Sequence, residues 1–123
     1  MLYYLIIWEV ILYTTENGDN PVGDFISSLP RKEEAKVFRE IDLLQQKGIY
    51  LNFPHSSDIE GFKGLRELRI RFSSNNIRII YFLHIKNIFV LLHGFRKKTQ
   101  RLPRRELEIS IIRMKDYLKR RGD

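Results

Sequence analysis

The chain opens with a run of apolar residues, 1–13, in which Glu9 is the one charged side chain. Isoleucine, valine, tyrosine and tryptophan recur in this run, a composition typical of a strand that is buried on both faces. The run is much shorter than the roughly 20 residues that span a bilayer. It also has neither a positively charged start nor a small-residue cleavage site. We therefore expect residues 1–13 to form the first strand of a cytoplasmic protein.

Apolar residues then recur with the period of helices. Asn20 directly before Pro21 is a typical helix start, because asparagine caps the first turn and proline suits the first helical position. The stripe that follows consists of Val22, Phe25, Ile26 and Leu29. A second helix is predicted over 31–47 and is ended by Gly48. Its apolar face is expected to consist of Ala35, Val37, Phe38, Ile41 and Leu44. Joined at Pro30, the two helices are expected to form an antiparallel hairpin over one face of a sheet.

Three strand candidates follow a less regular connection, 49–64. They cover 65–72, 77–85 and 88–95. The turns between them are short enough to force antiparallel hairpins. A last helix after Pro103 is marked by Leu107, Ile111, Met114 and Leu118. The order strand, helix, helix, three strands, helix predicts a single α+β domain over 1–123 with a mainly antiparallel sheet. The place of the first strand in that sheet stays open.

Composition adds a strong charge asymmetry. Residues 1–60 hold 5 basic and 10 acidic side chains, a balance of −5, whereas residues 61–123 hold 17 basic and 5 acidic ones, a balance of +12. Such a concentration of positive charge is expected for a protein that binds a polyanion, most often a nucleic acid. The alternative is a solvated basic surface that maintains solubility. The absence of cysteine excludes disulfide scaffolds, thiol nucleophiles and cysteine zinc sites.

The common motifs of cofactor and metal enzymes are missing. The sequence has no phosphate-binding glycine loop, dinucleotide fingerprint, His-Glu-x-x-His or Gly-x-Ser-x-Gly. Its three histidines, His55, His84 and His93, are far apart and lack the spacing of metal ligands. We therefore expect neither a cofactor nor a metal.

Basic residues inside the predicted strands are the main candidates for chemistry. With a period of two, Arg69 and Arg71 share one face of their strand with Glu67, while the apolar residues take the other face. Arg78 lies within an apolar run, where a charge is costly unless it is paired or functional. The third strand is followed by the basic segment 96–98. Because arginine is planar and permanently charged, the pattern predicts a phosphate-binding surface.

Each of these features also has a structural interpretation. Arg69 can pair with Glu67 on an exposed sheet face. Arg78 can form a buried ion pair with Glu9 of the first strand. Residues 96–98 can be a solvated loop.

Three segments together resemble a known toxin family. They are Gly64-Leu-Arg-Glu-Leu-Arg69, Ile77-Arg-Ile-Ile-Tyr81 and Leu91-Leu-His-Gly-Phe-Arg-Lys-Lys-Thr-Gln100. They are similar to the phage-derived Gp49-like branch of the RelE/ParE superfamily, which also includes HigB-type toxins. The resemblance implies a RelE-like fold and a type II toxin–antitoxin system. It further implies a metal-independent, ribosome-dependent endoribonuclease that cleaves mRNA through the substrate's own 2′-hydroxyl and so inhibits translation. The expected partners are mRNA, the ribosome and a helix-turn-helix antitoxin.

The resemblance also assigns residues to the site. Arg69 and Arg78 become phosphate and transition-state contacts, Lys97 lies in the basic segment at the strand end, and His93 is the candidate for proton transfer, since its ordinary pKa is near neutrality. Further RNA contacts are expected from Lys63, Arg66, Arg71, Arg96, Lys98 and Arg101.

The chain departs from the family pattern at two places. Arg66 stands where this branch often has tryptophan, and residues 99–116 lack the tyrosine that related enzymes carry shortly after the last strand. Tyr81 is then the substitute for that tyrosine as general base, because Tyr117 lies deep in the last helix. Two alternatives stay open: a non-nuclease, ParE-like toxin that inhibits gyrase, and a catalytically degenerate nucleic-acid-binding module.

Overall fold

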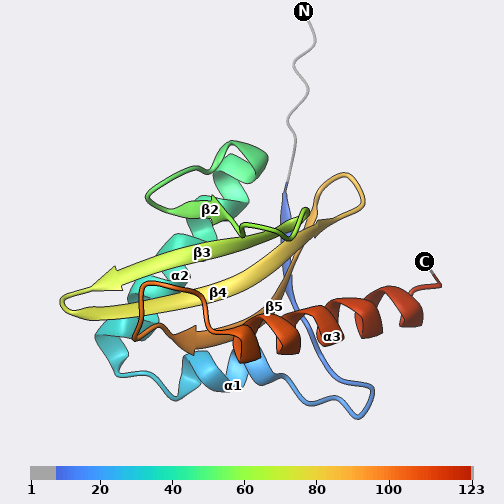
Figure 1. The fold of residues 1–123 in the computed structure, drawn as a ribbon, viewed down its shortest axis with the longest axis horizontal. Coiled ribbons are helices and arrows are strands. Elements are labelled where there is room, and N and C mark those ends of the chain that lie inside the picture. Colours follow the sequence, from blue (N-terminus) through green and yellow to red (C-terminus); the bar gives the residue numbers. More distant parts are fainter. Residues whose placement is uncertain (1–7, 123) are drawn as a thin grey trace, which may run out of the picture.

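A computed structural model describes residues 8–122 of the chain, except for the side chain of Asn75. Figure 1 shows one twisted sheet with helices on both faces. The elements are β1 (Glu9–Leu12), α1 (Pro21–Ser27), α2 (Arg31–Lys47), η1 (Gly48–Tyr50), β2 (Ser56–Asp58), β3 (Leu65–Phe72), β4 (Asn75–His84), β5 (Ile88–Arg96) and α3 (Arg104–Arg120). The α+β class is confirmed. No helix within 8–122 is long and apolar enough to cross a membrane.

The sheet has five strands in the order β1-β5-β4-β3-β2. β1 pairs with β5 in parallel, and the other neighbours are antiparallel. β1 is therefore an edge strand, and the prediction that it is buried on both faces is wrong: Glu9 is exposed and Val10, Ile11 and Leu12 are half-buried. Most of the apolar run that suggested a buried strand, 1–7, lies outside the described residues.

Two hydrophobic cores lie on opposite sides of the sheet. On one side, α1 and α2 pack against alternate residues of β3, β4 and β5, which include Leu68, Ile70, Ile77, Ile79 and Leu91. On the other side, α3 covers the residues between them, which include Leu65, Ile80, Phe82, Val90 and Phe95. The two-residue period of the strands thus sets which side chains meet which helix.

Helix α1 begins with the predicted cap. The Asn20 side chain accepts a hydrogen bond from the Gly23 amide.

The buried face of α2 differs from the predicted one. Ala35 and Phe38 are exposed, although Val37 and Leu44 are buried as expected. Glu33 and Glu40 are buried in their place. Apolar periodicity did not reveal this face because acidic residues occupy two of its positions. Both carboxylates have basic partners, Arg96 and His55, which compensate their burial.

The connection 49–64 is more regular than predicted. It contains most of η1 and also β2, which adds a fifth strand at the free edge of β3. The hairpin between β3 and β4 is tighter than expected: Phe72 pairs with Asn75, so Ser73 and Ser74 alone form its turn. Ser73 has a positive φ of 57°, as such a tight turn requires.

A bulge in β5 determines which side chains reach each face near the end of that strand. Tyr81 pairs with Leu91 but Ile80 pairs with His93, so Leu92 is an extra residue. Beyond the bulge, Phe95 joins the core on the α3 side. Gly94 and Arg96 point to the helices on the other side, where a Cβ on Gly94 would lie 2.4 Å from the ring of Phe25.

Candidate nucleic-acid interface

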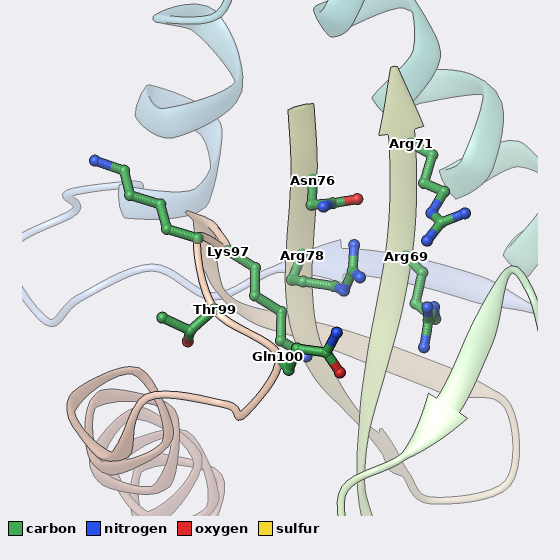
Figure 2. A pocket seen from close by; sticks show the side chains of 8 residues that line it. Arg69, Arg71, Asn76, Arg78, Lys97, Thr99 and Gln100 are labelled. Atoms are coloured by element: carbon green, nitrogen blue, oxygen red, sulfur yellow. The ribbon is translucent and has the colours of Figure 1, made fainter. Parts of the chain in front are cut away.

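A hollow of about 450 Å³ opens on the α3 side of the sheet, beyond the residues that α3 covers. Figure 2 shows its side chains, which come from β3, β4 and the segment after β5. They are Arg69, Arg71, Asn76, Arg78, Lys97, Lys98, Thr99 and Gln100. Five of these eight side chains are cationic. The predicted row of arginines on one face of the sheet is thus confirmed for β3 and β4.

Strand register brings the arginines together. Arg69 is the direct partner of Arg78 in the β3–β4 ladder, and Arg71 is the partner of Asn76. All four positions lie on the same side of the sheet because their strands alternate in phase. Lys97 is fixed beside them by its backbone amide, which donates a hydrogen bond of 2.7 Å to the Asn76 carbonyl.

Glu67 is the acidic residue that contacts this cluster. Its Oε1 lies 2.6 Å from Arg78 Nε and 3.6 Å from Lys97 Nζ, and the Glu67 and Arg78 side chains are both more than nine-tenths buried. A buried ion pair of Arg78 is therefore present, but its partner is Glu67 rather than Glu9. Burial lowers the pKa of Arg78, Glu67 raises it in part, and the nearby charges of Arg69 and Arg71 lower it again. Because arginine starts from so high a pKa, Arg78 keeps its charge.

The cluster carries more positive charge than Glu67 can compensate. Within the part of the chain that the structure describes, Arg69, Arg71 and Lys98 form no ion pair. The Nε of Arg69 is buried and has no hydrogen-bond partner there either. A buried donor without a partner costs about 1–3 kcal/mol. An anion in the hollow would neutralise these cations, and a phosphate group offers the oxygen acceptors that arginine binds best.

Arg66 is not part of this cluster. It is one position out of phase with Arg69 and lies on the opposite face, where it contacts Ser56, Tyr81 and Asp58. Tyr81 is on that face too, 1% exposed, with its hydroxyl 2.5 Å from Ser56 Oγ. The structure therefore separates Tyr81, the substitute for the missing family tyrosine, from the arginines by the thickness of the sheet.

His93 lies on the α3 side of the sheet but does not line the hollow. Its ring stacks on Phe95 and is held between two residues of α3. Arg113 can only donate, so Nδ1 accepts from Arg113 at 3.1 Å and Nε2–H donates to Glu106 at 2.9 Å. Burial lowers the pKa of His93, against an opposing effect of Glu106. His93 is therefore neutral at pH 7, with both nitrogens occupied.

The remaining candidates lie around the hollow rather than in it. Arg96 points to α2, where it binds both carboxylate oxygens of Glu33 at 2.7 and 3.1 Å, and this pairing raises the Arg96 pKa. Arg101 lines a neighbouring hollow, and Lys63 lies in the loop before β3. Of the predicted site residues, the structure thus gathers five: Arg69, Arg71, Arg78, Lys97 and Lys98.

Three polar residues of the hollow were not predicted. The predicted strands 65–72 and 77–85 leave Asn76 in the turn between them, and only the two-residue hairpin places it opposite Arg71. Thr99 and Gln100 directly follow the basic segment, so their position in the chain was the available signal. Within 8–122 there is no group of three or more histidine or acidic side chains that could hold a metal ion.

The chain matches the model of a known protein family. The model of a family described as Phage derived protein Gp49-like (DUF891) matches residues 24–115, a range that contains every residue of the hollow. No curated protein matches the chain. The Gp49-like family is associated with RelE/HigB-like toxins, and the sheet and helices described above are consistent with a RelE-like fold. Because the family model matches well over half of the chain, the chain belongs to the phage-derived Gp49-like family.

Proposed function

We propose that this protein is the toxin of a type II toxin–antitoxin system and that it cleaves mRNA in the basic hollow. The observation that carries the proposal is a hollow lined by five cationic residues, of which Arg78 and Lys97 contact the acidic Glu67. A solvated basic surface does not require cations in register on adjacent strands, with one of them buried at the centre. A site for a phosphodiester does, because its donors must be fixed before negative charge develops.

The reaction that suits these residues uses the substrate as its own nucleophile. The 2′-hydroxyl of one nucleotide attacks the adjacent phosphorus, the bond to the 5′-oxygen of the next nucleotide breaks, and a 2′,3′-cyclic phosphate remains. The 2′-hydroxyl loses a proton and the leaving 5′-oxygen gains one. The protein has to stabilise extra charge on the phosphate oxygens and assist the proton transfers.

The roles follow from position and chemistry. Arg69 and Arg78, opposite each other at the centre of the hollow, are the contacts for the phosphate oxygens. Lys97 is the candidate proton donor to the leaving oxygen, since an ammonium group can both donate and neutralise. His93 would first have to break its hydrogen bonds to Glu106 and Arg113. We therefore assign no proton transfer to His93.

The proposed partners follow from the same charge. Family membership makes an antitoxin a plausible partner. We expect a helix-turn-helix antitoxin with an acidic segment, which would cover the basic hollow and so block it. The mRNA substrate is expected to be cut on the ribosome, as the resemblance implies.

The test is brief induction in bacteria without antitoxin. Wild-type protein should arrest growth and translation, and primer extension on cellular mRNA should show new 5′ ends. Arg69→Ala combined with Arg71→Ala should show neither effect, whereas Arg39→Ala, an exposed arginine on α2, should behave like wild type. Normal growth at full soluble expression would contradict the toxin assignment. Growth arrest with loss of DNA supercoiling and no new mRNA ends would favour the gyrase alternative.

A further inference from the structure

Phe53 is an aromatic residue that neither hydrophobic core uses. It lies in the loop between η1 and β2, and its side chain is mostly in water, at 67% exposure. Its ring nevertheless has a fixed neighbour: the Cζ atom of Arg69 lies 4.8 Å from the ring centroid. This contact places Phe53 at the border of the basic hollow, with its ring against one of the hollow's central arginines. Most of the ring stays in water, which costs free energy unless a ligand or partner covers it.

The loop that carries Phe53 is attached to the same strand as the arginines. The His55 carbonyl accepts a hydrogen bond of 2.8 Å from the Arg69 amide, and His55 Nδ1 lies 2.8 Å from Glu40 on α2. The backbone amide of Phe53 donates a hydrogen bond of 2.9 Å to Asn52 Oδ1. The position of Phe53 relative to Arg69 is thus set by backbone pairing and by a contact to a buried acid.

This arrangement has the two parts that single-stranded nucleic acids require. Cations bind the phosphate, and an exposed ring offers a flat surface on which a base can stack. The guanidinium of Arg69 covers part of the ring, and the remaining surface is open to solvent. A base on the open surface and a guanidinium on the ring are compatible, because both interactions use the ring's π-electrons.

We propose that Phe53 is a stacking platform for an unpaired nucleobase next to the phosphate held in the hollow. This inference rests on the proposed function and names its substrate class, single-stranded RNA with a base turned out of its stack. Duplex RNA does not fit, since the flat faces of its bases are covered by their neighbours. Phe53 then orients the strand, and Arg69 couples the base contact to the phosphate contact.

Other exposed aromatic side chains lack this connection. Phe38 on α2 is 51% exposed, on the face opposite to the hollow, and Tyr50 in η1 is 77% exposed. Within residues 8–122, neither ring has a contact with a residue of the hollow like that of Phe53 with Arg69. Phe38 is therefore a matched control: the same residue type with similar exposure, away from the arginines.

The experiment measures binding of a short, fluorescently labelled single-stranded RNA with 2′-O-methyl sugars, which the proposed reaction cannot cut. Phe53→Leu should weaken binding by roughly tenfold, because leucine has no ring on which a base can stack. Phe53→Trp should bind at least as tightly as wild type, and Phe38→Leu should be unchanged. Binding by Phe53→Leu at the wild-type affinity would overturn the stacking inference and leave the proposed function intact. A wild-type protein that does not bind the RNA would also overturn the stacking inference, whereas the proposed function is tested separately by mRNA cleavage after induction.

An abasic series separates stacking from an indirect effect on Arg69. One base at a time is removed from the RNA, and wild type is compared with Phe53→Leu. If Phe53 stacks on a base, the difference between the two proteins should disappear at one position of the abasic residue. If Phe53 only holds Arg69 in place, the difference should persist at every position, and the inference is wrong.

Discussion

Arg69 and Arg78 are direct cross-strand partners, and both side chains lie on the sheet face that carries the hollow. Like charges in directly opposite positions destabilise a strand pair. The fold gains nothing from such a pair in the middle of its sheet. A locally unfavourable arrangement of this kind is typical of a functional site. An anion bound between the two guanidinium groups would replace their repulsion by attraction.

The first prediction follows from this pair. Arg69→Gln should leave the free energy of unfolding within about 0.5 kcal/mol of wild type. It relieves the repulsion but removes the cation–π contact to Phe53, which is worth about 0.5–1 kcal/mol. Urea denaturation measures the stability. RNA binding by the same protein should fall about tenfold or more, as for other arginine contacts to nucleic acids. A loss of several kcal/mol would mean that Arg69 is mainly structural.

Arg78→Gln should behave differently, because Arg78 is the close partner of the buried Glu67 carboxylate. Removing one partner of a buried ion pair costs about 3 kcal/mol or more, and the more distant Lys97 compensates only a part. The double variant Arg78→Gln with Glu67→Gln should regain most of the lost stability. A double-mutant cycle from urea denaturation checks this. If the two single effects simply add, the two side chains do not form the pair described here.

Arg96 should prove structural even though it belongs to the basic segment 96–98. Its guanidinium binds both oxygens of the buried Glu33. Arg96→Ala should lower the free energy of unfolding by about 2 kcal/mol, less than for a fully buried pair because Arg96 is partly exposed. Its affinity for RNA at a temperature where it is folded should stay near that of wild type. Weakened RNA binding with unchanged stability would place Arg96 in the interface instead.

The environment of His93 predicts a dependence of stability on pH. Burial and the charges of Arg113 and Arg105 lower its pKa, while Glu106 opposes them. Below about pH 6.5 the unfolded chain therefore takes up a proton that the folded protein does not. The contribution of His93 to the free energy of unfolding is therefore complete above about pH 6.5 and decreases as the pH falls toward the lower pKa of the folded state. Measured by urea denaturation at several pH values, the free energy of unfolding should decrease less with falling pH for His93→Asn than for wild type. The same decrease in both proteins would mean that folding does not lower the pKa of His93.

Local pattern was sufficient to predict several elements. The bounds of β3 and α2 agree with the predicted 65–72 and 31–47. The alternation along β3 placed Arg69 and Arg71 on one face because a strand repeats every two residues. Such features depend only on neighbours in the chain.

Other features depend on partners that are distant in sequence. The bulge at Leu92 has no local signature, yet it decides that Arg96 points to α2 while Lys97 lines the hollow. The strand period alone puts Arg66 on the face opposite to Arg69, but its partners on that face, Ser56 and Tyr81, come from other strands. The position of Phe53 beside Arg69 depends on β2, a strand of three residues whose pairing with β3 the sequence pattern did not indicate.

We propose that RNA is cut in the basic hollow by attack of its own 2′-hydroxyl. The most direct measurement uses purified protein and ribosomes programmed with an mRNA that carries a single 2′-deoxy nucleotide at the mapped cleavage position. Wild-type protein should cut the all-ribose mRNA and leave a 2′,3′-cyclic phosphate. It should not cut the other mRNA at the 2′-deoxy position, and Arg69→Gln should cut neither mRNA. Cleavage of the 2′-deoxy mRNA at the same position would show that the 2′-hydroxyl is not the nucleophile, and cleavage by Arg69→Gln at the wild-type rate would show that the reaction does not use the basic hollow.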